Sequence, residues 1–422
     1  MLRKAAPTDP APRTVRPKAA TRLPWLLGPA LVAGVAYLDP GNVASNMTAG
    51  ARYGYLLVWV VVAGNVMAWL VQYLSAKLGL ATGRSLPELL GLRVRSTAGR
   101  RLYWLQAELV AMATDVAEVI GGAVALWLLF DLPLLLGGLI TGGVSMAVLA
   151  VQGSGRHRSF EYVIVSMMAI IAIGFTAGVF VAPPDPAAVA EGLVPRFDGP
   201  GSVLLAASIL GATVMPHAIY AHSALTRDRF PQRSAGLTTS TLIRATRWDV
   251  TIALAVAGTV NLAILLLAAT SLQGVEGTDT LEGAHAAIGG ALGGGVALLF
   301  ALGLLASGLA STSVGAYAGA EIMQGLLKVR IPMLLRRLIT LLPALAILAA
   351  GVDPTWALVL SQVVLSFGIP FALVPLLWLT SRTDLMGEHR NRWWTTALGV
   401  VVAGLLIALN VVLLYLTFTG AG

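Results

Sequence analysis

A single carboxylate lies inside an apolar segment, directly before a helix-breaking residue. Asp39 precedes Pro40 and Gly41 in a run of otherwise apolar residues. A charged side chain in the middle of a membrane span is expensive unless it is paired or functional. Pro40 cannot donate a backbone hydrogen bond to the carbonyl of Ala36, and in lipid that carbonyl needs another partner. We therefore predict that this helix unwinds over residues 37–42 and that Asp39 is functional.

A second apolar segment carries the same kind of break. Pro216 follows Met215 and frees the carbonyl of Ala212. Residues 36–40 and 212–216 share the pattern Ala-x-x-(Asp or Met)-Pro, and five apolar spans separate them. An odd number of spans per unit makes two units run in opposite directions through the membrane. This arrangement is the inverted repeat of many secondary transporters.

The two breaks together offer a mixed set of metal ligands. Asp39, Asn42 and Met215 supply a carboxylate, an amide oxygen and a thioether, and Ala36 and Ala212 supply backbone carbonyls. Mg²⁺ and Ca²⁺ prefer shells made only of oxygen, whereas a thioether favours softer ions such as Mn²⁺, Fe²⁺, Co²⁺ and Cd²⁺. We predict a transition-metal site in which Met215 selects against alkaline-earth ions. From the residue type alone, Met215 is equally well explained as a packing residue.

A stripe of acids runs along a third apolar segment. Glu108, Asp115 and Glu118 fall within about 80° of the circumference of a helix, so all three face one side. Three candidate partners, His217, Arg336 and Arg337, lie in other spans. Such groups can relay protons where water is scarce, but a structural ion-pair network explains them as well. For the two arginines, charge at the cytoplasmic end of a span is a third explanation.

The composition indicates an all-helical membrane protein. Of the 422 residues, 57% are hydrophobic and 11% charged, against about 25% charged in soluble domains. The absence of cysteine excludes disulfides and cysteine-based metal centres. No constellation typical of a membrane enzyme is visible among the five histidines. Apolar runs predict about eleven spans, at residues 25–49, 54–80, 102–129, 132–152, 160–182, 202–226, 247–272, 294–326, 333–351, 355–380 and 394–418.

The basic residues predict the orientation of the chain. If the N-terminus is cytoplasmic, 26 of the 28 Lys and Arg residues lie on the cytoplasmic side, and only Arg52 and Arg196 lie outside. The C-terminus is then extracellular. Residues 1–23 are predicted to form a disordered basic tail, and residues 24–422 a single transmembrane domain.

These residues resemble the Nramp family of divalent metal transporters, which includes bacterial proton-coupled manganese transporters. The resemblance covers nearly the whole chain after the tail. It rests on residues 39–42 (Asp-Pro-Gly-Asn), on residues 215–217 (Met-Pro-His) and on residues 308–325, which contain Tyr-Ala-Gly. Relatives that transport magnesium lack the methionine, so its presence here favours a transition metal.

The resemblance implies a fold and a set of roles. The fold is LeuT-like, with inverted five-helix repeats at about 24–182 and 202–380, broken first and sixth helices, and an extra helix at about 394–418. Metal binding is implied for Asp39, Asn42, Met215, Ala36 and Ala212, with Gln362 joining when the outer side closes. Proton movement is implied for Asp39, His217, Glu108, Asp115, Glu118, Arg336 and Arg337.

The resemblance also implies alternating access in the cell membrane, with metal ions and protons as substrates. Neither a cofactor nor an obligatory protein partner is expected. The main alternative is a transporter of organic solutes such as amino acids with the same fold. The carboxylate of Asp39 in the break disfavours this alternative, because its negative charge would repel an anionic substrate.

Overall fold

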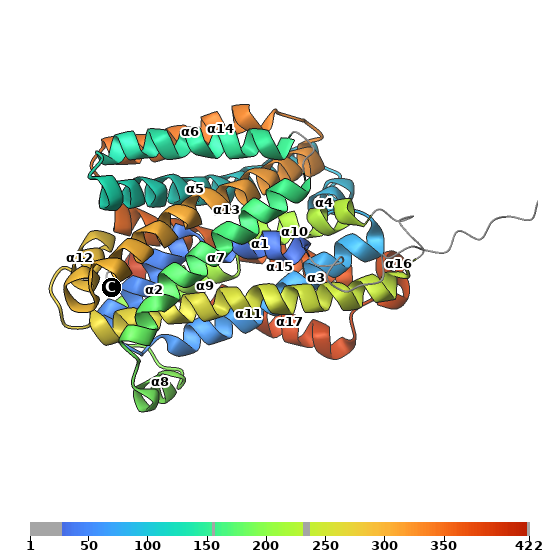
Figure 1. The fold of residues 1–422 in the computed structure, drawn as a ribbon. Coiled ribbons are helices and arrows are strands. Elements are labelled where there is room, and N and C mark those ends of the chain that lie inside the picture. Colours follow the sequence, from blue (N-terminus) through green and yellow to red (C-terminus); the bar gives the residue numbers. More distant parts are fainter. Residues whose placement is uncertain (1–27, 154–156, 231–236, 420–422) are drawn as a thin grey trace, which may run out of the picture.

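The structure of the chain is a computed structural model that describes residues 28–153, 157–230 and 237–419 (Figure 1). Within these ranges, all regular structure is helical and there are no strands. The predicted tail at residues 1–23 lies outside the described residues.

Eleven helical segments occupy the positions of the eleven predicted spans. The two broken segments consist of α1 (Pro29–Gly34), a 3-10 turn (Val35–Leu38) and α2 (Pro40–Tyr53), and of α9 (Gly199–Thr213) and α10 (Pro216–Arg229). The others are α3 (Val58–Thr82), α5 (Thr97–Phe130), α6 (Leu134–Gly153), α7 (His157–Val181), α11 (Thr239–Ser271), α13 (Gly294–Leu327), α14 (Met333–Ala349), α15 (Pro354–Thr380) and α17 (Trp393–Thr419). Eight described segments, one of them α9 with α10, are long and apolar enough to cross a membrane.

Short helices that the apolar pattern did not predict lie at the two ends of the bundle. One end carries α8 (Pro186–Gly192) and α12 (Leu281–Leu292), and the other carries α4 (Leu86–Arg93) and α16 (Thr383–Met386) (Figure 1). A short 3-10 turn follows α16 at Gly387–His389. Helix α4 begins with a capping box, in which Ser85 and Glu88 each accept a hydrogen bond from the other's backbone N–H. These helices are too short to show the periodic pattern of a membrane span.

The packing of the helices is reciprocal, as an inverted repeat requires. The helices from α1 to α7, without α4, form one unit, and those from α9 to α15, without α12, form the other. Helix α11 of the second unit packs on α2 of the first, and α3 of the first packs on α10 of the second. In the same way α13 packs on α7, and α5 packs on α15. Helix α17 lies outside both units, against α15, α9 and α3.

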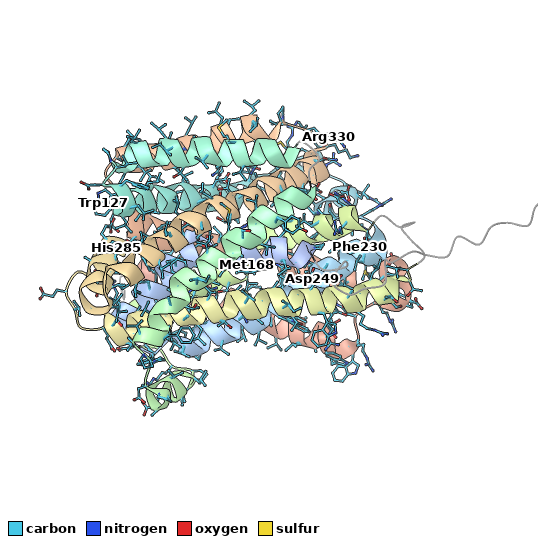
Figure 2. All side chains as sticks on the ribbon, in the orientation of Figure 1. Trp127, Met168, Phe230, Asp249, His285 and Arg330 are labelled. Carbon is cyan, nitrogen blue, oxygen red and sulfur yellow. The ribbon has the colours of Figure 1, made fainter. Side chains whose placement is uncertain are left out.

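Large apolar side chains cover the outside of the bundle (Figure 2). Phe180, Leu102 and Val66 are exposed by 86%, 70% and 63%. Polar side chains such as Asp39, Asn42 and Gln362 are fully buried instead. Because apolar side chains face outward and these polar side chains face inward, lipid surrounds the long helices and the candidate functional residues lie at their centre.

Candidate functional site

The first α-helix is interrupted from Val35 to Asp39. A 3-10 turn occupies Val35–Leu38, the backbone of Asp39 is extended (φ −68°, ψ 163°), and α2 begins at Pro40. The interruption therefore begins two residues before the predicted range of 37–42 and ends three residues before its end. Asp39 caps α2 because its Oδ1 accepts hydrogen bonds from the backbone N–H of Asn42 (2.9 Å) and from Asn42 Nδ2 (2.7 Å). A carboxylate stabilises the positive end of a helix. Proline is favoured at the first helical position, where its missing N–H would have no partner within the helix.

Other side chains satisfy the backbone around this break. Asn261 Nδ2 donates to the carbonyl of Tyr37 at 2.9 Å, and the Ser307 hydroxyl donates to the carbonyl of Leu38. The carbonyl of Ala36, predicted to be free, accepts a long bond of 3.3 Å from the N–H of Asp39. The roles of Asn261 and Ser307 were not predicted from the sequence. Their only signal in the sequence is that each is a polar residue within an apolar span, α11 or α13.

The second helix breaks between Thr213 and Pro216. Val214 and Met215 have non-helical backbones, and Met215 is fully buried. Asn42 Nδ2 also donates to the carbonyl of Ala212 at 2.9 Å. This hydrogen bond joins the two breaks directly, so residues separated by 170 positions in the chain meet at one point.

Gln362 of α15 completes the site. Its Nε2 donates to Asp39 Oδ2 at 3.2 Å. Two glycines make this approach possible. A Cβ on Gly41 would lie 1.8 Å from Gln362 Nε2, and one on Gly211 would lie 2.0 Å from the Gln362 carbonyl oxygen. A larger residue at position 41 would displace the Gln362 side chain, and one at position 211 would push the backbone of α15 away from α9.

Two oxygens beside Asp39 have no partner among the described residues. Asn42 Oδ1 and Gln362 Oε1 are buried and accept no hydrogen bond. Buried polar atoms without partners are rare in proteins and need an explanation. No group of three or more His, Cys, Asp or Glu able to hold a metal occurs in the described ranges. A cation at this point would therefore draw on amide and backbone oxygens as well as on Asp39.

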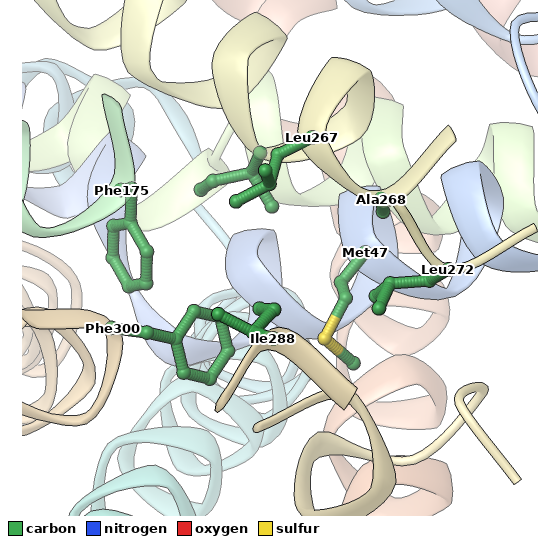
Figure 3. A pocket seen from close by; sticks show the side chains of 8 residues that line it. Met47, Phe175, Leu267, Ala268, Leu272, Ile288 and Phe300 are labelled. Atoms are coloured by element: carbon green, nitrogen blue, oxygen red, sulfur yellow. The ribbon is translucent and has the colours of Figure 1, made fainter. Parts of the chain in front are cut away.

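The site is closed toward the end of the bundle that carries α12. A small apolar cavity of about 10 Å³ lies between α12 and the breaks (Figure 3). Met47 of α2, Ile288 of α12 and Phe300 of α13 line it. All eight side chains that line this cavity are apolar.

The opposite end is closed by polar contacts to α1. The carboxylate of Asp249 in α11 accepts hydrogen bonds from the N–H of Gly28 (3.2 Å) and of Ala30 (2.9 Å) at the start of α1. Below the break, His222 Nδ1 and Gln72 Oε1 lie 2.8 Å apart. His222 of α10 thus contacts α3. The side chains of Asp249, His222 and Gln72 are all buried.

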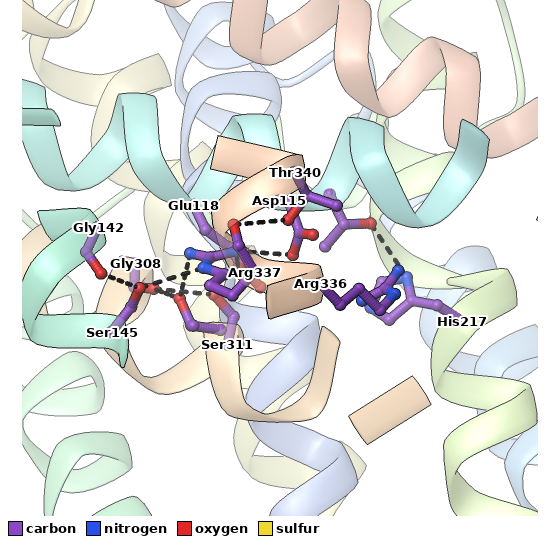
Figure 4. Close-up of polar contacts among 12 residues, drawn as sticks. Asp115, Glu118, Gly142, Ser145, His217, Gly308, Ser311, Arg336, Arg337 and Thr340 are labelled. Carbon is purple, nitrogen blue, oxygen red and sulfur yellow. Dashed lines mark hydrogen bonds and ion pairs between the residues drawn. The ribbon is translucent and has the colours of Figure 1, made fainter. Parts of the chain in front are cut away.

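The acids of α5 meet the arginines of α14 in a buried network (Figure 4). Arg336 Nη2 lies 2.7 Å from Glu108 Oε1. Arg337 Nη1 lies 2.7 Å from Asp115 Oδ1 and 3.1 Å from Glu118 Oε2. The acid stripe and two of its three predicted partners, Arg336 and Arg337, are therefore brought together in buried positions. Three carboxylates against two guanidinium groups leave one excess negative charge when all are ionised.

His217 lies between this network and the breaks. Its Nδ1 lies 3.2 Å from Thr114 Oγ1, and its buried Nε2 has no partner among the described residues. His217 follows directly after Pro216 in the second break, and Thr114 directly precedes Asp115, so this contact links the second break to the helix that carries the acids.

The first comparison with known proteins decides the family. A family profile described as Natural resistance-associated macrophage protein-like (Nramp) matches residues 30–416. The chain belongs to the Nramp family. The Nramp family is one of transporters and not of enzymes, and this chain is a multi-pass membrane protein.

Several relatives of this Nramp chain are similar over nearly its whole length. The divalent metal cation transporter MntH of Mycobacterium tuberculosis (strain H37Rv) is 61% identical over 396 residues, which are 94% of this chain and 92% of the relative. That of Bacillus subtilis (strain 168) is 47% identical over 402 residues, or 94% and 93%. A crystal structure of the manganese transporter of Eremococcus coleocola matches with a TM-score of 0.83 at 30% identity, covering 94% of this chain and 88% of that one. The fold is therefore the expected LeuT-like one.

Proposed function

We propose that this chain imports divalent transition metal ions, Mn²⁺ first and also Fe²⁺, Co²⁺ and Cd²⁺, together with protons and by alternating access. We place its N-terminus in the cytoplasm and its C-terminus outside the cell, from the distribution of Lys and Arg. The relatives named as divalent metal cation transporters support the substrate class.

One observation carries this proposal. Asp39, Asn42, Gln362 and the carbonyl of Ala212 converge at the point where two helices break, and two of their amide oxygens lack partners. A carboxylate with several neutral oxygens suits a divalent cation. Met215, in the second break, adds a thioether that suits Mn²⁺ better than Ca²⁺. Nothing in this geometry favours an organic solute.

Metal binding would rearrange the hydrogen bonds of Asn42. Its amide N–H groups now donate to Asp39 and to the carbonyl of Ala212. A rotation of the amide would turn Oδ1 toward the ion and release the Ala212 carbonyl and the carboxylate as ligands. The same argument applies to Gln362, whose Nε2 faces Asp39 while Oε1 is unpaired. The Ala36 carbonyl would join if its long bond to Asp39 N–H opened.

Protons would move through the α5 network. The arrival of a dication at Asp39 favours loss of any proton there, and the released proton needs an acceptor in a site without visible water access. Glu118 is fully buried in this network, and its Oε1 has no partner among the described residues. We assign Glu118, Asp115 and His217 to proton transfer. Arg337 and the Arg336–Glu108 pair position these groups.

Alternating access would use the two closures. Release to the cytoplasm requires α1 to leave Asp249, and entry from outside requires α9 to leave Gln362 and Ser45. Each break separates a moving half-helix from the rest of its span. The membrane potential assists import, since each charge gains about 2.3 kcal/mol per 100 mV.

The test is Mn²⁺ uptake into proteoliposomes that contain the purified protein, with and without an acidic exterior. The Asp39→Ala variant should abolish uptake, whereas Asp185→Ala, an exposed cap of α8, should not. An acidic exterior should accelerate uptake by the wild type, and a pH-sensitive dye inside the vesicles should record proton entry with Mn²⁺. Absence of uptake by correctly folded wild-type protein would refute the metal assignment. Uptake without any response to the gradient would refute only the coupling.

A further inference from the structure

A groove open to the membrane runs along the outside of α9. It has a volume of about 400 Å³ and an almost entirely apolar lining. Three helices build it: α3 with Trp59 and Met67, α9 with Val203 and Leu210, and α17 with Leu405 and Val412. The site at Asp39 is not part of it, and neither the metal nor the proton route uses it.

The lining residues show how the groove is oriented. On α3 they extend over nine residues, and on α9 and α17 over eight, which is about 10–12 Å from the first to the last at the rise of an α-helix. Three helices thus line the same length, so the groove runs along the helices and not across them. Its upper end lies at the starts of α3 and α9, at the end of the bundle that carries α8. Its lower end, at Leu210, is one turn from the second break.

Arg196 lies next to the upper end, because it directly precedes the lining residue Phe197. Trp59 Nε1 donates to the carbonyl of Arg196 at 3.2 Å, and the rings of Trp59 and Phe197 meet edge to face at 5.4 Å. Arg196 is exposed and forms no ion pair with the described residues, although Asp198 lies two positions further on. The other arginine at this end, Arg52, is paired with Asp279 at 2.6 Å. A tryptophan beside an arginine at the end of a membrane span is typical of the level of lipid headgroups.

We propose that this groove binds one acyl chain of a membrane phospholipid, with its phosphate at Arg196. The apolar lining suits the acyl chain, and the exposed Arg196, which directly precedes the lining residue Phe197, supplies a positive charge that suits the phosphate. The lining residues Leu405 and Val412 are exposed by 55% and 45%, so the groove opens directly to lipid.

Binding here would act on a moving half-helix. On α9 the groove residues Val203, Ala206 and Leu210 form one stripe. Ser208, on the opposite face, contacts the Ser45 hydroxyl at 2.5 Å and donates to the Val359 carbonyl at 3.1 Å. An acyl chain would therefore hold α9 against α2 and α15 and favour the state that is closed to the outside.

The experiment uses delipidated full-length protein, titrated with 1-palmitoyl-2-oleoyl-phosphatidylglycerol and observed by native mass spectrometry. Ala408 lines the groove, so Ala408→Trp should fill it. Ile407→Trp is the matched control, because it is exposed at the same depth and does not line the groove. We expect wild type and Ile407→Trp to bind one lipid at least about tenfold more tightly than Ala408→Trp, the loss expected when about two methylene groups leave an apolar contact. Arg196→Gln should weaken the same binding.

Equal lipid binding by Ala408→Trp and Ile407→Trp would overturn the proposal. The same spectra report the oligomeric state. If Ala408→Trp lost a dimer that the wild type forms but kept its bound lipid, a second copy of the chain would be the occupant of the groove. That result would also overturn the lipid proposal. Should Ala408→Trp fail to fold, the quenching of tryptophan fluorescence by lipids with brominated acyl chains tests the proposal instead. The fluorescence of the wild type should be quenched more strongly than that of Trp59→Phe. Equal quenching would refute contact between an acyl chain and Trp59.

Discussion

Replacing Gly211 by alanine should separate the two helices that close the site. The added Cβ would lie 2.0 Å from the Gln362 carbonyl oxygen and 2.9 Å from the Ser366 backbone nitrogen. Ordinary contact begins at 3.4 Å, so α9 and α15 must move apart by about 1.4 Å. Both obstructing atoms belong to backbone, and neither can rotate away.

This displacement has two calculable effects. Overpacking of a tight contact destabilises a protein by about 1–3 kcal/mol. The hydrogen bond from Gln362 to Asp39, now 3.2 Å long, would be stretched beyond about 3.5 Å and lost. Because metal ligands tolerate shifts of only about 0.2 Å, Gln362 would also leave the proposed metal shell. We expect Mn²⁺ to bind at least about tenfold more weakly, which is about 1.4 kcal/mol.

Two measurements check this reasoning. Titration with SDS in mixed micelles reports the change in the free energy of unfolding, and calorimetric titration of Mn²⁺ reports the affinity. Gly143→Ala is the control, because a Cβ on that exposed glycine of α6 meets no atom within 4 Å. If Gly211→Ala matched Gly143→Ala in both measurements, the close approach of α9 and α15 would not support the site.

Three further variants test other parts of the molecule. Met215→Ala should reduce the preference for Mn²⁺ over Ca²⁺ in competition uptake by about tenfold, since a thioether assists only the softer ion; unchanged discrimination would return Met215 to a packing role. Arg336→Ala leaves the buried Glu108 without its partner and should destabilise the fold by about 3–5 kcal/mol in the SDS titration. A double variant that also carries Glu108→Gln should recover part of that loss if the pair is the cause. Asp249→Ala removes the acceptor of two N–H groups of α1 and should accelerate hydrogen exchange at residues 29–34, with a loss of about 1–2 kcal/mol; unaltered exchange would show that α1 is held elsewhere.

One set of contacts at the end of the bundle that carries α4 was not predictable from the sequence. Arg227 of α10 forms ion pairs with Glu88 of α4 at 2.9 Å and with Glu321 of α13 at 3.1 Å. Tyr317 donates to Asp228 beside it at 2.6 Å. From the sequence, Arg227 is predicted only to be one of the basic residues on the cytoplasmic side. Its partners come from elements far away along the chain, and only the packing of α4 on α10 and α13 brings them together.

Local chemistry by itself determined much of this protein. Apolar runs about 20 residues long predict spans, because lipid leaves the backbone no other way to satisfy its hydrogen bonds. Proline at positions 40 and 216 predicts the two breaks for the same reason. An acid in such a span is a candidate site by its energy alone, so Asp39 was predictable without its partners.

The tertiary structure decided what those residues meet. Asn261 and Ser307, from distant helices, satisfy the carbonyls of Tyr37 and Leu38 beside the break at Asp39. Gln362 reaches Asp39 only because Gly41 and Gly211 allow close approach. The arginines of α14 pair with the acids of α5 instead of facing the cytoplasm. Side-chain type and helical period are local properties, whereas contacts between helices depend on how whole spans pack, and no single segment encodes that packing.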